Sequence, residues 1–188
     1  MDEQYRVMVD FLVAEGTGKV SHTKKSFLAH LIGVYRDLEA WGCERDVCRA
    51  GMFHSIYGTE PFQGFKLPLE RRGEVRALIG ERAERLAYLN SAMTRATFDA
   101  TIQQDEDPHK MVDRFTGNEV ELAPADFKDL CTVHLCDWLE QVERYESWDN
   151  RRSAFRRLAE MLSGVAMESY ERVCAREPKP SLSAGSRA

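Results

Sequence analysis

The sequence lacks any long apolar run. No segment of the 188-residue chain approaches the eighteen consecutive apolar residues that a membrane-spanning helix requires. The N-terminal stretch MDEQYRVMVDFLVAEG is charged, and its apolar run is too short for a secretion signal. We therefore expect a cytoplasmic protein that does not associate with membranes.

Cysteine is scarce and carries no recognisable pattern. The chain has five cysteines, which is an odd number. Cys43 and Cys48 are five positions apart, as are Cys131 and Cys136, and this is not the spacing of a zinc knuckle. We expect reduced thiols and no cysteine metal site, in keeping with the cytoplasm.

The chain also lacks a surplus of basic residues. It has 26 lysines and arginines against 31 aspartates and glutamates, for a net charge of -5. This balance argues against a general binder of nucleic acid or of membrane surfaces. It leaves room for a local basic pocket, which is all that a phosphorylated small molecule requires.

Apolar residues recur at helical spacing along most of the chain. Gly42 lies where a helix should stop, and Pro124 or Asp126 where one should start. The hydrophobic content of 43% is enough for one core. The segments with a helical pattern are residues 26–42, 45–58, 71–90, 124–148 and 151–174.

One segment of the chain has the pattern of a β-strand. In VDRFTGNEVELAP, the turn at residues 116–118 separates residues 114–115 from residues 119–122, which predicts a short hairpin. The sequence has no internal repeats, and residues 177–188 are rich in Pro, Ser and Gly. We expect an all-α helical bundle with one short β-hairpin, a single domain over residues 1–176 and a disordered tail over residues 177–188.

Several of the predicted helices carry polar residues on their apolar faces. His30 lies at the edge of the first apolar stripe, His54 lies in the second, and His134 and Asp137 share a face of the fourth. Any one of these histidines alone is explained by a hydrogen bond in the core. Two imidazoles and a carboxylate together suit a first-row divalent metal with positions left for water. Such a metal lowers the pKa of its bound water and supplies a hydroxide nucleophile.

The stretch SHTKKSFLAHLIGVYRDLEAWGCERDVCRAGMFHS resembles the opening of an HD-superfamily domain. It is most similar to the Rel/SpoT-type alarmone hydrolases, and it also resembles uncharacterised bacterial HD-like domains that carry FHSIYGT. HLCDWLEQV resembles the later segment that delivers the family's last aspartate, and the whole similarity covers residues 18 to 165 approximately. The resemblance implies a helical bundle, phosphoester hydrolysis and one manganese, iron or zinc ion held by His30, His54 and Asp137.

The chain departs from the family at one position. The signature pair is His-Asp, whereas this chain has His54 followed by Ser55. Either the metal binds more weakly, or Glu60 or Glu84 replaces the missing carboxylate in a catalytic role, or catalysis has been lost. Tyr57, one helical turn beyond His54, either donates to a bound phosphate or packs in the core.

Basic residues near the metal would neutralise a substrate phosphate, although each is also explained as a solvated charge. His22 follows Ser21, a plausible helix cap, and lies either at the pocket mouth or at the surface. His109, in an acidic loop, is expected at the surface, and the three tryptophans are expected to pack. The candidates for substrate binding are His22, Lys24, Lys25 and Arg72.

These observations favour a metal-dependent hydrolase of a phosphorylated small molecule or nucleotide, with metal-bound water as the nucleophile. Two alternatives stay open. One is an iron-dependent oxygenase-type enzyme on an HD scaffold, and the other is a catalytically inactive binding module. The expected partner is a small-molecule substrate, with no nucleic acid and no membrane, and a homo-oligomer is compatible with the sequence.

Overall fold

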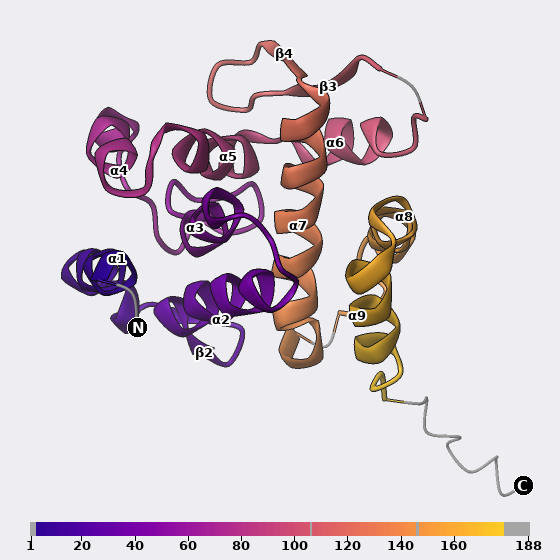
Figure 1. The fold of residues 1–188 in the computed structure, drawn as a ribbon, viewed down its shortest axis with the longest axis horizontal. Helices are drawn as coiled ribbons and strands as arrows, with labels where there is room; N and C mark the ends of the chain where they lie inside the picture. The colour runs from indigo at the N-terminus through magenta and orange to yellow at the C-terminus, as the bar shows by residue number, and fades with distance from the viewer. Residues whose placement is uncertain (1–2, 106, 146, 179–188) are drawn as a thin grey trace, which may run out of the picture.

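The structure, a computed structural model, describes residues 3–105, 107–145 and 147–178. It is mostly helical, as the sequence predicts (Figure 1). The helices are α1 (Glu3–Ala14), α2 (Phe27–Ala40), α3 (Arg45–Phe53), α4 (Arg72–Ile79), α5 (Glu81–Ala92), α6 (Arg95–Thr101), α7 (Pro124–Tyr145), α8 (Arg152–Leu162) and α9 (Gly164–Cys174).

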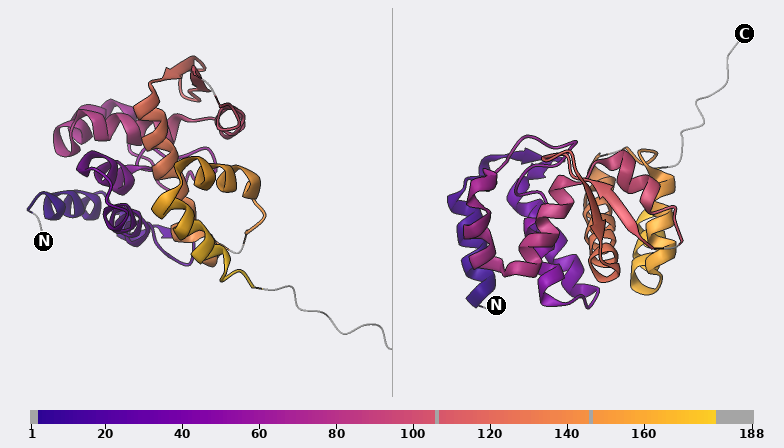
Figure 2. Two further views of the ribbon diagram at one scale, coloured as in Figure 1. Left: turned by 45° about the vertical axis from the view of Figure 1, so that its right-hand side comes forward. Right: turned by 90° about the horizontal axis from the view of Figure 1, so that it is seen from above.

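Helix α7 is the central element of the bundle. It packs against α2, α3 and α5 on one side and against α8 and α9 on the other (Figure 1). Val133 and Cys136 join the apolar cluster of α1 to α5, whereas Leu130 and Leu135 join the cluster of α8, α9 and the hairpin. A helix that is apolar on opposite faces is buried on both sides. The two clusters therefore meet on α7, and α1 and α9 lie toward opposite ends of the molecule (Figure 2).

The start of α2 differs from the prediction. Ser21 does not cap a helix but begins β1 (Ser21–His22), which pairs antiparallel with β2 (Lys25–Ser26). The turn residues Thr23 and Lys24 both have positive φ, 43° and 63°, as a two-residue type I′ hairpin requires. Ser26 is the N-cap of α2, since its hydroxyl accepts a hydrogen bond from the Ala29 backbone N–H.

Two of the predicted helical segments are each divided in two. Residues 71–90 form α4 and α5, because Gly80 between them has φ 96°, a value incompatible with a continuous helix. Residues 151–174 form α8 and α9, with a break at Ser163 and Gly164, which also have positive φ. The predicted stop at Gly42 is confirmed, since α2 ends just before it and its φ is 74°.

The predicted hairpin exists, but its first strand lies earlier in the chain than expected. β3 (His109–Val112) pairs with β4 (Glu119–Leu122). The prediction that His109 lies at the surface is wrong. Its ring is only 9% exposed, stacks on Phe127 with ring centroids 3.8 Å apart, and is bonded to Asp107. His109 pairs with the buried Leu122 of β4 and stacks on Phe127 of α7, and neither contact is visible in the local sequence.

Within the described residues, no helix combines the length and the apolarity that crossing a bilayer requires. Most of the predicted tail, residues 179–188, lies outside the described residues. Trp138 and Trp148 are buried in the core and Trp41 packs against both clusters, as expected.

Candidate metal centre

Three helices bring His30, His54 and Asp137 to one point. His30 comes from α2, His54 from the end of α3 and Asp137 from α7, and all three side chains are buried. The Nε2 atoms of the two histidines are 3.3 Å apart. Asp137 Oδ1 lies 3.1 Å from His30 Nε2 and 3.3 Å from His54 Nε2. In the described part of the chain, this is the group of three side chains that could hold a metal ion.

Close packing of α3 against α2 places His54. A Cβ on Gly51 would lie 2.2 Å from Leu38 Cδ1, so only glycine permits this approach of the two helices. Helix α3 ends at Phe53, and the backbone carbonyl of His54 accepts hydrogen bonds from Asn90 and Ser91 of α5. The turn that follows α3 is therefore fixed to the next layer of the bundle.

Hydrogen bonds fix which nitrogen of each histidine faces the centre. His54 Nδ1 donates to the Gly51 carbonyl at 2.7 Å, and His30 Nδ1 donates to the Glu140 carboxylate at 2.5 Å. In the neutral rings, each Nε2 then carries a lone pair. Two lone pairs and a carboxylate oxygen therefore point at one another, and this arrangement is repulsive unless a cation lies between them.

The electrostatics of the centre favour positive charge. Burial alone would lower the pKa of His30, but the Asp137 and Glu140 carboxylates, which accept hydrogen bonds from the ring, outweigh it and raise that pKa. Burial would raise the pKa of Asp137, but the two histidines outweigh it and hold that pKa well below its usual range. The site therefore retains a carboxylate and attracts a cation, either protons or a metal ion.

Glu140 forms a second layer behind His30. Its side chain is 7% exposed and also binds Lys25 and Arg144. A Cβ on Gly33 would lie 2.6 Å from the Glu140 carboxylate, so α2 approaches α7 closely at this point. A carboxylate that accepts the free N–H of a ligand histidine is the usual support of a metal site. Lys25 is thus engaged behind the triad and is not placed to meet a substrate.

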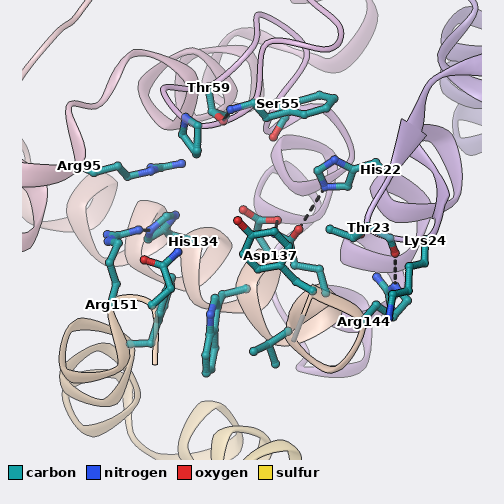
Figure 3. Close-up of a pocket in the computed structure, with 18 of the residues that line it drawn as sticks. His22, Thr23, Lys24, Ser55, Thr59, Arg95, His134, Asp137, Arg144 and Arg151 are labelled. Carbon is teal, nitrogen blue, oxygen red and sulfur yellow. Dashed lines mark hydrogen bonds between the residues drawn. The ribbon is translucent and has the colours of Figure 1, made fainter. Parts of the chain in front are cut away.

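Of the triad, Asp137 lines a pocket of about 530 Å³, whereas His30 and His54 are buried behind it. Asp137 and Ser55 line it, so the position of the missing family aspartate faces this space. Figure 3 shows Asp137 between two groups of basic side chains. Arg95, His134 and Arg151 lie on one side of it, and His22, Lys24 and Arg144 lie on the other.

His22 lies in the pocket wall and is half-buried. Its Nε2 donates to Gln141, whose amide in turn donates to Asp137 Oδ1 at 2.8 Å. Burial, together with the neighbouring His30, lowers the pKa of His22 to about 4. His22 is therefore neutral near pH 7 and contacts Asp137 through Gln141, and of the two positions considered for it, the pocket is where it lies. Lys24 is exposed at the pocket rim, as the sequence allowed.

Four predicted site residues are not brought to the triad. Tyr57 donates to Glu84 at 2.9 Å, and Arg72 binds both oxygens of the same carboxylate. Glu84 and Tyr57 are each 1% exposed, and the half-buried Arg72 and the exposed Arg76 pair with Glu84 from the surface side. Of the two roles considered for Tyr57, packing describes its position. Glu60 is exposed and accepts from the backbone N–H of Arg95. Neither glutamate stands in for the missing aspartate.

Sequence reasoning missed Glu140, Gln141, Arg95 and Arg151. A signal existed for the first two, because they follow Asp137 by about one turn on the same helix. No local signal marks Arg95 and Arg151. Each stands at the start of a helix whose position in space depends on the tertiary fold.

Fold and centre together define a mostly α-helical protein with a candidate metal site of two histidines and one carboxylate. Residues 11–95 match a family model described as a domain of unknown function (DUF6817). That match covers less than half of the chain and includes His30, His54 and Arg95 but not Asp137. No curated protein and no solved structure matches the chain.

Proposed function

We propose that this protein is a metal-dependent hydrolase of a phosphorylated small molecule or nucleotide, on a helical bundle of the HD type. The observation that carries the proposal is the convergence of two imidazole nitrogens on a carboxylate, that of Asp137, which lines a pocket with several basic side chains. Both Nδ1 atoms are engaged elsewhere, and the Nε2 atoms contact each other and Asp137.

The spacing of the three ligand atoms suits a divalent ion. Ligands bound at about 2.1 Å are about 3.0 Å apart at a right angle and about 3.4 Å apart at the tetrahedral angle. The observed separations of 3.1, 3.3 and 3.3 Å fall between these values. Three protein ligands leave coordination positions on the pocket side for water and substrate. The residues present therefore fit a manganese, iron or zinc ion.

Each neighbouring residue has a definable part in this function. A bound divalent ion would supply a hydroxide nucleophile at neutral pH by lowering the pKa of coordinated water. Glu140 and the Gly51 carbonyl orient the two histidines, and Gln141 orients Asp137. Arginines of the pocket neutralise phosphate charge, because cationic donors stabilise negative charge that grows in the transition state.

A second function shares the same ligand set. Two histidines and one carboxylate with open positions also form the site of non-haem iron oxygenases. Metal content and activity separate the two. Bound manganese or zinc with hydrolysis of a phosphomonoester supports the hydrolase, whereas stoichiometric iron with oxygen consumption supports the oxygenase. No metal in the purified protein and none taken up on titration would leave only a binding module.

The ligand assignment is tested by metal titration of the wild type and His54→Ala. We expect about one equivalent of metal in the wild type and none retained by His54→Ala. A matched control is His109→Ala, which removes a buried histidine from the hairpin and should leave metal binding unchanged. If His54→Ala binds metal as tightly as the wild type, the assignment is wrong.

A further inference from the structure

Arg95 presents an unpaired donor at the pocket. The backbone N–H of Arg95, at the start of α6, donates to Glu60, and the side chain of Arg95 extends into the pocket (Figure 3). Nη1 of Arg95 is buried and has no hydrogen-bond partner among the described residues. Burial lowers the pKa of Arg95 to about 10, with a further contribution from Arg151, so the guanidinium is still charged near pH 7. Arg95 is half-buried, and of its guanidinium nitrogens Nη1 is the one that is buried without a partner among the described residues. A buried donor of a charged group that makes no hydrogen bond is costly, and a bound anion would remove that cost.

His134 presents a second unpaired donor in the same wall. Arg151 Nη1 donates to His134 Nε2 at 2.9 Å, so the hydrogen of the neutral ring is on Nδ1. Burial, with Arg95 and Arg151 nearby, holds the pKa of His134 well below its usual range, so the ring is neutral. Nδ1 is buried and has no acceptor among the described residues.

The backbone at Arg151 is strained in a way that serves this arrangement. Its φ is 55°, in the left-handed region that non-glycine residues rarely adopt. Asp99 binds its guanidinium at Nε and Nη2, which leaves Nη1 directed at His134. Such strain persists only where the surrounding contacts impose it, and it is concentrated at ligand sites.

We propose that Arg95, with His134 and Arg151, binds a phosphoryl group of the substrate beside the triad. The proposal deepens the proposed function, because it assigns the part of the pocket that recognises the substrate's phosphate. The donors come from the starts of α6 and α8 and from α7. Donors that approach from several directions suit a tetrahedral anion better than a planar carboxylate.

Inorganic phosphate is the probe, and the experiment is done in the presence of EDTA. Phosphate should raise the melting temperature of the wild type relative to chloride at equal ionic strength, because a ligand that binds only the folded state stabilises it. Acetate should have no such effect. Isothermal titration gives the affinity for phosphate directly.

The variant Arg95→Met removes the charge but retains the apolar length of the side chain. We expect it to lose the response to phosphate, with affinity at least about tenfold weaker, while its melting temperature without phosphate stays equal or rises. Arg95→Lys, which keeps the charge but not the fork of donors, should bind phosphate with intermediate affinity and serves if Arg95→Met does not fold. The matched control is Arg85→Gln, an exposed arginine that binds Asp126 and should respond as the wild type does.

The inference is overturned if phosphate does not stabilise the wild type, if Arg95→Met responds equally, or if acetate acts as well as phosphate. Because chelator is present throughout, the outcome is independent of the metal. Phosphate binding through Arg95 without any metal uptake would contradict the hydrolase and support this subsite. Metal uptake without phosphate binding would support the metal centre and contradict the phosphate subsite.

Discussion

Glu140 gives a test of how the centre is supported. The change Glu140→Gln keeps the size of the side chain but removes the charge that holds His30 Nδ1, Lys25 and Arg144. Loss of a carboxylate behind a ligand histidine typically weakens metal affinity by about 10- to 100-fold. That range corresponds to about 1.4–2.7 kcal/mol of binding free energy.

The assay is the affinity for Mn²⁺ or Zn²⁺, measured against a competing chelator, together with melting curves with and without metal. For a chain of this size, 1 kcal/mol shifts the melting temperature by about 2–4 °C. At a metal concentration that saturates the wild type, metal should raise the melting temperature of Glu140→Gln by roughly 3–10 °C less than it raises that of the wild type.

A suitable control is Glu143→Gln on the same helix. Glu143 is exposed and binds Arg176 at the surface, so its loss should leave metal affinity unchanged. Equal metal affinity in Glu140→Gln and the wild type would refute the argument that this carboxylate orients His30 for a metal.

Two further changes test the position of the missing aspartate and the packing that places His54. Ser55→Asp should tighten metal binding, because it adds a carboxylate to the pocket wall next to His54. The control Ser55→Asn has the same shape without the charge and should bind metal as the wild type does. Equal metal affinities of Ser55→Asp and Ser55→Asn in a titration would count against a ligand role for this position. Gly51→Ala should lower the free energy of unfolding in urea by about 1–3 kcal/mol, because the new Cβ meets the fully buried Leu38. Gly73→Ala, where a Cβ meets nothing within 4 Å, should be neutral or stabilising, and a similar loss there would show that Gly51 has no special packing role.

The ligand set was predictable because helical periodicity decides which side chains face inward. His30, His54 and Asp137 each lie on the apolar face of a helix or at its end, and the same criterion also selects His134. The all-α class follows from the same periodicity. The resemblance to HD domains is what reduced these candidates to three ligands, because helical spacing alone does not distinguish among them.

The remaining parts of the site depend on features that local sequence does not encode. Charge and proximity in the sequence do not reveal that the Glu84 carboxylate is engaged by Tyr57 and Arg72, away from the triad. His109 was misjudged because its burial depends on the pairing of β3 with β4. Arg95 and Arg151 line one pocket although the hairpin and α7 separate them in the sequence, so their proximity depends on the tertiary arrangement.

Because the two apolar clusters meet on α7, a metal ion bound at the candidate centre would also influence folding. Between His54 and Asp137 the chain includes α4, α5, α6 and the β3–β4 hairpin. An ion bound to both residues would act as a clip across this long loop, and the entropy of closing a loop grows with its length. Helix α7 must therefore dock before the third ligand is available, so a fragment that ends before Pro124 would retain both histidines but only two of the three ligands.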